Sequence, residues 1–177
     1  MTHRSESLGE YVLDEREVII TRTDPASRIT YANDGFLRST GYSLAEVMGQ
    51  PQNLVRHPDM PKAAFADLWK TIQSGRAWTG IVKNRRKDGG FYWVRANVTP
   101  ILGNGAIVGY LSVRVKPTRE EVETATGLYA RMNAGALRGL RLEGGELKRT
   151  GAIGAIAGLG EMPLRTRAAF VLGLQAV

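Results

Sequence analysis

The stretch AWTGIVKNRRKDGGFYWVRANVTPILGNGAIVGYLSVRVK, residues 77–116, decides the fold of this chain. It holds three segments rich in β-branched and aromatic residues, 77–86, 91–102 and 106–116, and the sequences KDGG and GNG separate them. Glycine beside Asp or Asn is typical of the tight turns that join antiparallel strands. The stretch therefore predicts a three-stranded antiparallel meander.

The residues before the meander predict two more strands and a helical block. Residues 16–33 alternate β-branched and polar side chains on either side of the turn DPAS. A cap at Asn33 or Asp34, a capping box at 43–46 and apolar residues at helical spacing within 61–75 then indicate three helices. Because the last three strands are hairpin neighbours, this block must cross between the two halves of a sheet. We expect an α+β fold, a five-stranded antiparallel sheet with short helices on one face enclosing a cup.

The composition of the 177 residues excludes several classes of function. The chain has no Cys, so it has neither disulfides nor cysteine-based zinc sites nor thiol catalysis. Its net charge of +7 would suit a nucleic acid. However, residues 1–118 hold 16 Lys and Arg against 11 Asp and Glu, and the longest basic run, at 83–87, leads into a turn. We therefore expect no nucleic-acid partner.

Several motifs carry a family resemblance. Residues 29–51 (ITYANDGFLRSTGYSLAEVMGQP), 83–101 and 109–115 resemble a PAS domain, which would cover about residues 17–118. The segment VRHPDMPKAAFADLW, residues 55–69, is similar to the flavin-binding PAS domains of bacterial aerotaxis receptors. The resemblance implies non-covalently bound FAD whose redox state reports oxygen or electron-transport status. It implies neither a catalytic residue nor a metal site.

The resemblance also implies which residues bind the flavin. By matching motif these are Arg56, His57, Asp59, Trp69 and Asn84, together with Asn33 at the start of the ANDGF motif. Asn84 offers a donor and an acceptor for the polar edge of the flavin ring, and strand alternation directs Trp78 to the same side. For His57 the alternatives are a proton partner of the flavin or a structural histidine. For Trp69 they are a wall of the pocket or part of the core.

Light-sensing flavin PAS domains resemble the sequence too, and the differences are informative. Their reactive cysteine would fall near Asn53, so the absence of Cys excludes a covalent photoadduct. Val94 stands where they have an asparagine, and Arg114 stands where they have a glutamine. We expect Arg114 to lie near the flavin edge, to favour reduced forms and to raise the reduction potential. The alternative is an arginine that faces solvent.

The resemblance and the composition together divide the chain. We expect an N-terminal cap segment at 1–16, the PAS domain at 17–118, a linker helix at 119–134, a Gly-rich linker of weak structure at 135–163 and the start of a membrane-anchor helix at 164–177. Arg165 and Arg167 precede the last apolar run, as at the cytoplasmic flank of a membrane span. A short amphipathic C-terminal helix is the alternative.

The function that follows is a cytoplasmic FAD redox sensor at the inner face of the membrane. We expect anchoring by a continuation of the C-terminus and an output domain outside this chain. A homodimer would form through the N-terminal segment or the sheet face, because Phe91 and Trp93 are predicted to point outward. The alternatives are a ligand-free PAS interaction module and, last, a flavin oxidoreductase, for which the sequence offers no Gly-x-Gly-x-x-Gly motif.

Overall fold

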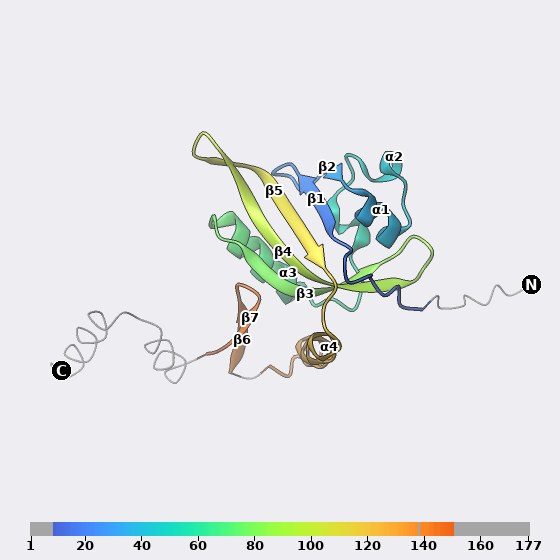
Figure 1. Ribbon diagram of the computed structural model, residues 1–177. Coiled ribbons are helices and arrows are strands. Elements are labelled where there is room, and N and C mark those ends of the chain that lie inside the picture. The colour runs from blue at the N-terminus through green and yellow to red at the C-terminus, as the bar shows by residue number, and fades with distance from the viewer. Residues whose placement is uncertain (1–8, 138, 151–177) are drawn as a thin grey trace, which may run out of the picture.

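The computed structural model describes residues 9–137 and 139–150, and its main element is a five-stranded antiparallel sheet in the order β2-β1-β5-β4-β3 (Figure 1). The strands are β1 (Ile19–Thr23), β2 (Ile29–Ala32), β3 (Trp78–Arg85), β4 (Phe91–Gly103) and β5 (Ala106–Val115). The meander pairs β3 with β4 and β4 with β5, and β1 closes against β5. The predicted five-stranded α+β fold is confirmed.

The helical block lies between β2 and β3 in the chain and covers one face of the sheet (Figure 1). It consists of α1 (Asp34–Thr40), α2 (Leu44–Val47), the 3-10 helix η1 (Gln52–Val55) and α3 (Lys62–Gln73). The Asn33 side chain accepts a hydrogen bond from the Phe36 N–H at the start of α1, and Ser43 and Glu46 form a capping box on α2. These caps satisfy backbone N–H groups that a helix start leaves without partners, as the sequence predicted.

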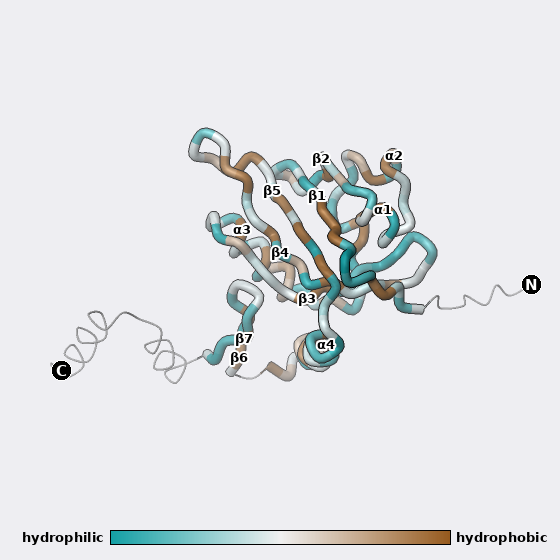
Figure 2. The backbone as a smooth tube through the Cα atoms, viewed as in Figure 1, coloured by the Kyte–Doolittle hydropathy of each residue, from teal (hydrophilic) through white to brown (hydrophobic). Residues whose placement is uncertain are grey.

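The core lies between this block and the sheet, because alternate strand residues point inward. On β4, Tyr92, Val94 and Ala96 are buried, and Phe36 of α1 and Ile72 of α3 pack into the same cluster. Figure 2 shows this pattern as brown, hydrophobic positions that interrupt the polar ones along the strands. The inward face of the sheet is therefore the face that can hold a ligand.

The outward face of the sheet is covered by the chain itself at its aromatic end. The Tyr11 N–H donates to the Phe91 carbonyl at 2.8 Å, and Leu13 packs into the buried cluster with Trp93 and with Val122 of α4 (Arg119–Asn133). Trp93 is only 8% exposed. The expectation that Trp93 is open to a partner was wrong, because strand alternation does not reveal what covers the outward side. A homodimer through the N-terminal segment or the rest of the sheet face stays a prediction.

Residues 140–149 form a second, two-stranded sheet, β6 (Leu140–Glu143) and β7 (Glu146–Arg149), against α3. The prediction of weak structure was wrong for these residues. The sequence signal for this hairpin was the pair Gly144–Gly145. The two glycines adopt φ of 67° and 88° and so form a two-residue hairpin turn. In the described part of the chain no helix is long and apolar enough to cross a membrane. The predicted anchor at 164–177 lies outside the described residues.

Candidate functional site

A cavity of about 120 Å³ lies between the helical block and the inward face of the sheet. Its walls come from β1, η1, α3 and the three meander strands. The lining residues are Thr21, Thr23, Ser27, Gln52, Asn53, Val55, Arg56, Phe65, Leu68, Trp69, Ile72, Val82, Asn84, Ala96, Val98, Tyr110, Ser112 and Arg114.

Several polar side chains in the wall carry buried atoms with no hydrogen-bond partner among the described residues. They are Thr21 Oγ1, both amide atoms of Gln52, Asn84 Nδ2, Ser112 Oγ and Arg114 Nη1. A buried polar atom without a partner is costly and rare in folded proteins. Their concentration on one mostly apolar cavity indicates a site built for a ligand that supplies the missing donors and acceptors.

Arg114 is the most exceptional of these groups. It lies on β5 opposite Ala96 of β4, its side chain is buried, and its Cζ lies 5.8 Å from the centroid of the Phe36 ring. Burial lowers the pKa of its guanidinium, although arginine stays protonated at neutral pH. None of the described residues that line the cavity is acidic. The cavity therefore presents a positive charge that is not neutralised from its own wall.

The elbow between η1 and α3, residues 56–61, contributes Arg56 to the cavity wall beside β3, the edge strand of the sheet. Arg56 forms an isolated antiparallel bridge with Asn84, which places both residues at the same wall. The Arg56 guanidinium lies over the Phe65 ring, with Cζ 4.0 Å from the centroid. Pro58 and Pro61 restrict this segment, and Pro61 is the N-cap residue of α3. A rigid elbow thus brings one cation to a cavity formed by β3 and α3.

Trp69 lies in the cavity wall and also packs against the core cluster. It belongs to α3, and its ring meets the Tyr110 ring edge to face, with 5.5 Å between centroids. Phe65 and Leu68 line the cavity from the same helix. Together these side chains form an apolar wall facing the polar groups of β3 and β5.

His57 and Asp59 leave the elbow on the side away from the cavity and are not among its lining residues. The His57 ring meets the Phe91 ring edge to face, and its Nδ1 accepts from the Asp59 N–H at 3.2 Å. Burial and nearby Lys83 lower the pKa of His57. The hydrogen bond from Lys83 Nζ to Asp59, at 2.6 Å, lowers the pKa of that carboxyl group. This geometry matches the structural alternative for His57.

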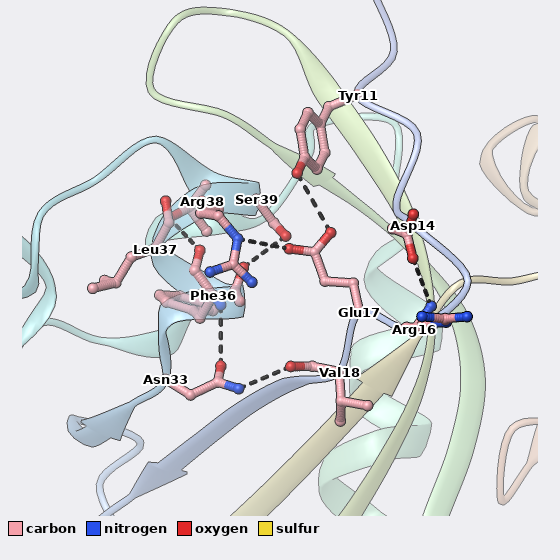
Figure 3. A network of polar contacts seen from close by, with 12 residues as sticks. Tyr11, Asp14, Arg16, Glu17, Val18, Asn33, Phe36, Leu37, Arg38 and Ser39 are labelled. Carbon is pink, nitrogen blue, oxygen red and sulfur yellow. Dashed lines mark hydrogen bonds and ion pairs between the residues drawn. The ribbon is translucent and has the colours of Figure 1, made fainter.

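Asn33 also lies outside the cavity, and its amide is occupied by hydrogen bonds to backbone groups (Figure 3). Its Oδ1 accepts from the N–H groups of Ile20 and Phe36, and its Nδ2 donates to the Val18 carbonyl at 2.8 Å. Figure 3 shows Glu17 beside this cap, bonded to Tyr11 and Arg38. Asn33 therefore joins α1 to β1.

Trp78 points inward as predicted, but its ring lies over Gly80, further along the same strand, and does not reach the cavity. A Cβ atom on Gly80 would lie 2.3 Å from the Trp78 ring. The indole Nε1–H donates to Asp67 Oδ2 at 2.8 Å, and the ring is 2% exposed. Strand alternation gives the face of a side chain but not its direction along the strand, which a neighbouring carboxylate on α3 sets here.

The structure thus brings four of the eight predicted residues together, Arg56, Trp69, Asn84 and Arg114. The cofactor-binding role of all eight stays a prediction. The sequence did not lead us to Thr21, Gln52 and Ser112 as polar residues of the cavity wall. Strand alternation could have found two of them, because Ser112 lies two positions before Arg114 on β5 and pairs with Thr21 of β1.

The arrangement agrees with comparisons to known proteins. The family model of the PAS fold matches residues 29–114. Residues 29–114 form a PAS domain. The chain around this PAS domain is 47% identical over 165 residues to the aerotaxis receptor of Escherichia coli K12, covering 93% of this chain and 32% of that receptor. The chain therefore spans about a third of the length of that relative.

Solved structures with the same fold support the assignment of the PAS domain. One is the dark structure of the light-oxygen-voltage domain of the blue-light photoreceptor Aureochrome1, with 27% identity, a TM-score of 0.55, and 66% of this chain and 84% of that chain covered. Another is a light-oxygen-voltage domain studied with a flavin analogue, with 29% identity, a TM-score of 0.56, and 66% and 87% covered. The predicted PAS fold is confirmed.

Proposed function

We propose that this chain is the FAD-binding redox-sensing module of an aerotaxis-type receptor. The observation that carries the proposal is the cavity lined by apolar side chains on α3 and by buried polar atoms on β1, η1, β3 and β5 that have no partner in the part of the chain that the structure describes. A flavin ring needs this combination, an apolar slot with a few donors and acceptors along one polar edge. One structural relative is a light-oxygen-voltage domain studied with a flavin analogue, and this and the similarity to an aerotaxis receptor support the same ligand.

The residues of the wall divide into three roles toward such a ligand. Trp69 and Leu68 would hold the ring by apolar contact, Asn84 would bond its polar edge, and Arg56 would attract the phosphates. FAD, rather than a mononucleotide, is proposed from the resemblance of the elbow to that of the aerotaxis receptors. The bound flavin would supply reversible uptake of electrons.

Sensing would follow from the uncompensated charge in the wall. Because no acid lining the described cavity neutralises Arg114, its attraction to the ligand strengthens when reduction adds negative charge. Hydrogen bonds at Arg114 and Asn84 would then favour one of two packings of the surrounding elements. The proposal assigns the module a sensory role without turnover of a substrate.

The output of the module would reach a domain outside this chain. The E. coli receptor is about three times as long as the matched segment, which leaves room there for an output domain. We place the module on the cytoplasmic side of the membrane, and the support is the resemblance together with Arg165 and Arg167 ahead of an apolar run.

The colour and chromophore content of the purified chain test the proposal. We expect a yellow protein that releases FAD on denaturation, identified against FMN by chromatography, and whose flavin bleaches reversibly on reduction. A chain that stays colourless after incubation with FAD would contradict the proposal and favour a ligand-free interaction module. Steady oxidation of NAD(P)H by the loaded protein would instead favour an oxidoreductase.

A further inference from the structure

Asp67 is a buried carboxylate that joins three elements. It lies on α3, is 8% exposed, and accepts three hydrogen bonds. Its Oδ2 accepts from Trp78 Nε1–H of β3 at 2.8 Å and from the Gly145 N–H at 2.7 Å, and its Oδ1 accepts from the Gly144 N–H at 2.9 Å. Charge-assisted bonds of this kind are among the strongest in proteins. One side chain therefore fixes the tip of the β6–β7 hairpin to α3 and β3.

The hairpin tip fits its position closely. Gly145 approaches the Thr79 carbonyl of β3 so nearly that a Cβ atom would lie 1.7 Å from the oxygen. Gly144, next to it in the same turn, has open space where a Cβ atom would be. Leu142 of β6 adds an apolar contact with the core cluster. The tip is thus held by backbone contact with β3 and by the carboxylate of α3 at the same time.

The two elements that hold the tip are also two walls of the cavity. On α3 the cavity side carries Leu68, Trp69 and Ile72, and Asp67 points away from them to the hairpin. On β3 the cavity side carries Val82 and Asn84, four and six positions beyond Trp78. If a ligand in the cavity changes the distance between α3 and β3, the contacts of the hairpin tip with both elements must change as well.

From this arrangement we infer that Asp67 is a positioning residue that couples the cavity to the β6–β7 hairpin. Whether the hairpin is docked depends on the distance between α3 and β3. After β7 the chain continues into residues 151–177. The hairpin is thus a route by which the state of the ligand reaches the C-terminal part of the chain. The docking itself depends only on the described contacts, and its control by ligand rests on the proposed flavin function.

Hydrogen exchange of the full chain tests the docking. Asp67→Asn keeps the size of the side chain but replaces one acceptor oxygen with a donor, so at least one of the three bonds is lost. Gly145→Ala prevents the tip from approaching Thr79. We expect amide protection within 140–149 to fall about tenfold or more in both variants, the effect of losing one charge-assisted bond. Protection of β4 and β5 should be unchanged.

Gly144→Ala is the matched control. It places alanine at a similar positive φ in the same turn, and its Cβ atom meets nothing within 4 Å. Exchange in 140–149 should therefore rise less than in Gly145→Ala. Equal exchange in the two glycine variants would show that strain in the turn, and not loss of the contact between Gly145 and Thr79, causes the faster exchange. That result would overturn the docking. Unchanged protection in Asp67→Asn would overturn the role of Asp67.

The control by ligand is tested with FAD as the probe. Protection of 140–149 is compared in the flavin-free chain, with FAD bound, and after reduction of the bound FAD by dithionite. We expect a difference between these states in the unmodified chain and its loss in Asp67→Asn. Equal protection in all three states, with FAD bound, would overturn the coupling. A chain that binds no FAD would overturn the proposed function and the ligand control together, while the flavin-free variants would still decide the docking.

Discussion

The guanidinium of Arg114 lies 5.8 Å from the centroid of the Phe36 ring, in a cavity whose described lining contains no acid. A cation over an aromatic face is stabilised by the ring, but far less than by a carboxylate. Its buried Nη1 finds no hydrogen-bond partner among the residues that the structure describes. The position therefore favours a ligand that brings negative charge or an acceptor to this end of the cavity.

Replacement of Arg114 should lower the reduction potential of a bound flavin. Arg114→Gln removes the positive charge, so the more anionic reduced forms lose stabilisation. A difference of one to two kcal/mol corresponds to tens of millivolts for a one-electron couple, because about 59 mV is a tenfold change in the equilibrium. Spectroelectrochemical titration measures the midpoint. Arg114→Lys, which keeps the charge, should shift it less, and an unchanged midpoint in Arg114→Gln would remove Arg114 from this role.

Asn84 should determine how tightly the flavin is held. Its side chain is 4% exposed, its Nδ2 has no partner among the described residues, and its backbone pairs with Arg56. Asn84→Ala should reduce flavin affinity about tenfold, the loss of one to two hydrogen bonds at a buried site. Equilibrium titration with FAD measures the change.

Asn97 provides the control for this measurement. It lies on β4 with an exposed side chain that faces away from the cavity and donates to Thr79 Oγ1 at 2.9 Å. Asn97→Ala should bind FAD with the affinity of the unmodified chain. Equal affinities in the Asn84 and Asn97 variants would mean that Asn84 does not contact the ligand.

The sequence predicted the elements of the sheet because their signals are local. Turn glycines, capping boxes and β-branched runs act over a few residues, and the strands of the meander and the caps at Asn33 and Ser43 followed from them. The contacts that hold Asn33 and Trp78 outside the cavity were not accessible in the same way. They are made with residues 15 and 11 positions away, Val18 for Asn33 and Asp67 for Trp78. Tertiary contacts therefore decided which predicted residues reach the cavity.

The covering of the outward face could not be predicted from the strand pattern either. Alternation placed Trp93 outward correctly, but the residue is buried by segments at both ends of the domain, Leu13 and Val122 among them. A bidentate ion pair between Glu10 and Arg119, 109 positions apart, holds those segments together. A contact of this sequence separation has no local signal, which is why the sequence suggested an open surface.

Acidification should destabilise the fold through His57. Burial and the charge of Lys83 hold its pKa below the usual value, with Arg85 acting in the same direction and Asp59 opposing them. As the pH falls through about 6.5, the unfolded chain then binds more protons than the folded one, so the free energy of unfolding decreases. Urea unfolding at pH 7.5 and at pH 5.5, about one unit above and below the ordinary pKa of histidine, measures the change in the free energy of unfolding.

His57→Gln should show a smaller loss of stability over the same pH range, because the glutamine cannot titrate. Apart from Asp59, which lies beside His57, the other titratable groups are common to both proteins, so the comparison isolates His57. An identical pH dependence in both proteins would mean that the folded and unfolded chains protonate His57 equally.

Two helical glycines should respond to alanine with opposite signs. Gly35 of α1 lies against β1, and a Cβ atom there would be 2.6 Å from the Val18 carbonyl oxygen, which also accepts the bond from Asn33 Nδ2. Gly35→Ala should therefore lower the free energy of unfolding by about 1–3 kcal/mol, as overpacking does. Gly127 of α4 has open space around it, so Gly127→Ala should raise stability by up to about 1 kcal/mol through helix propensity alone. Denaturant unfolding at one pH compares the two variants. Stabilisation by both would show that α1 can move away from β1, and the Asn33 cap would then not fix the helix to the sheet.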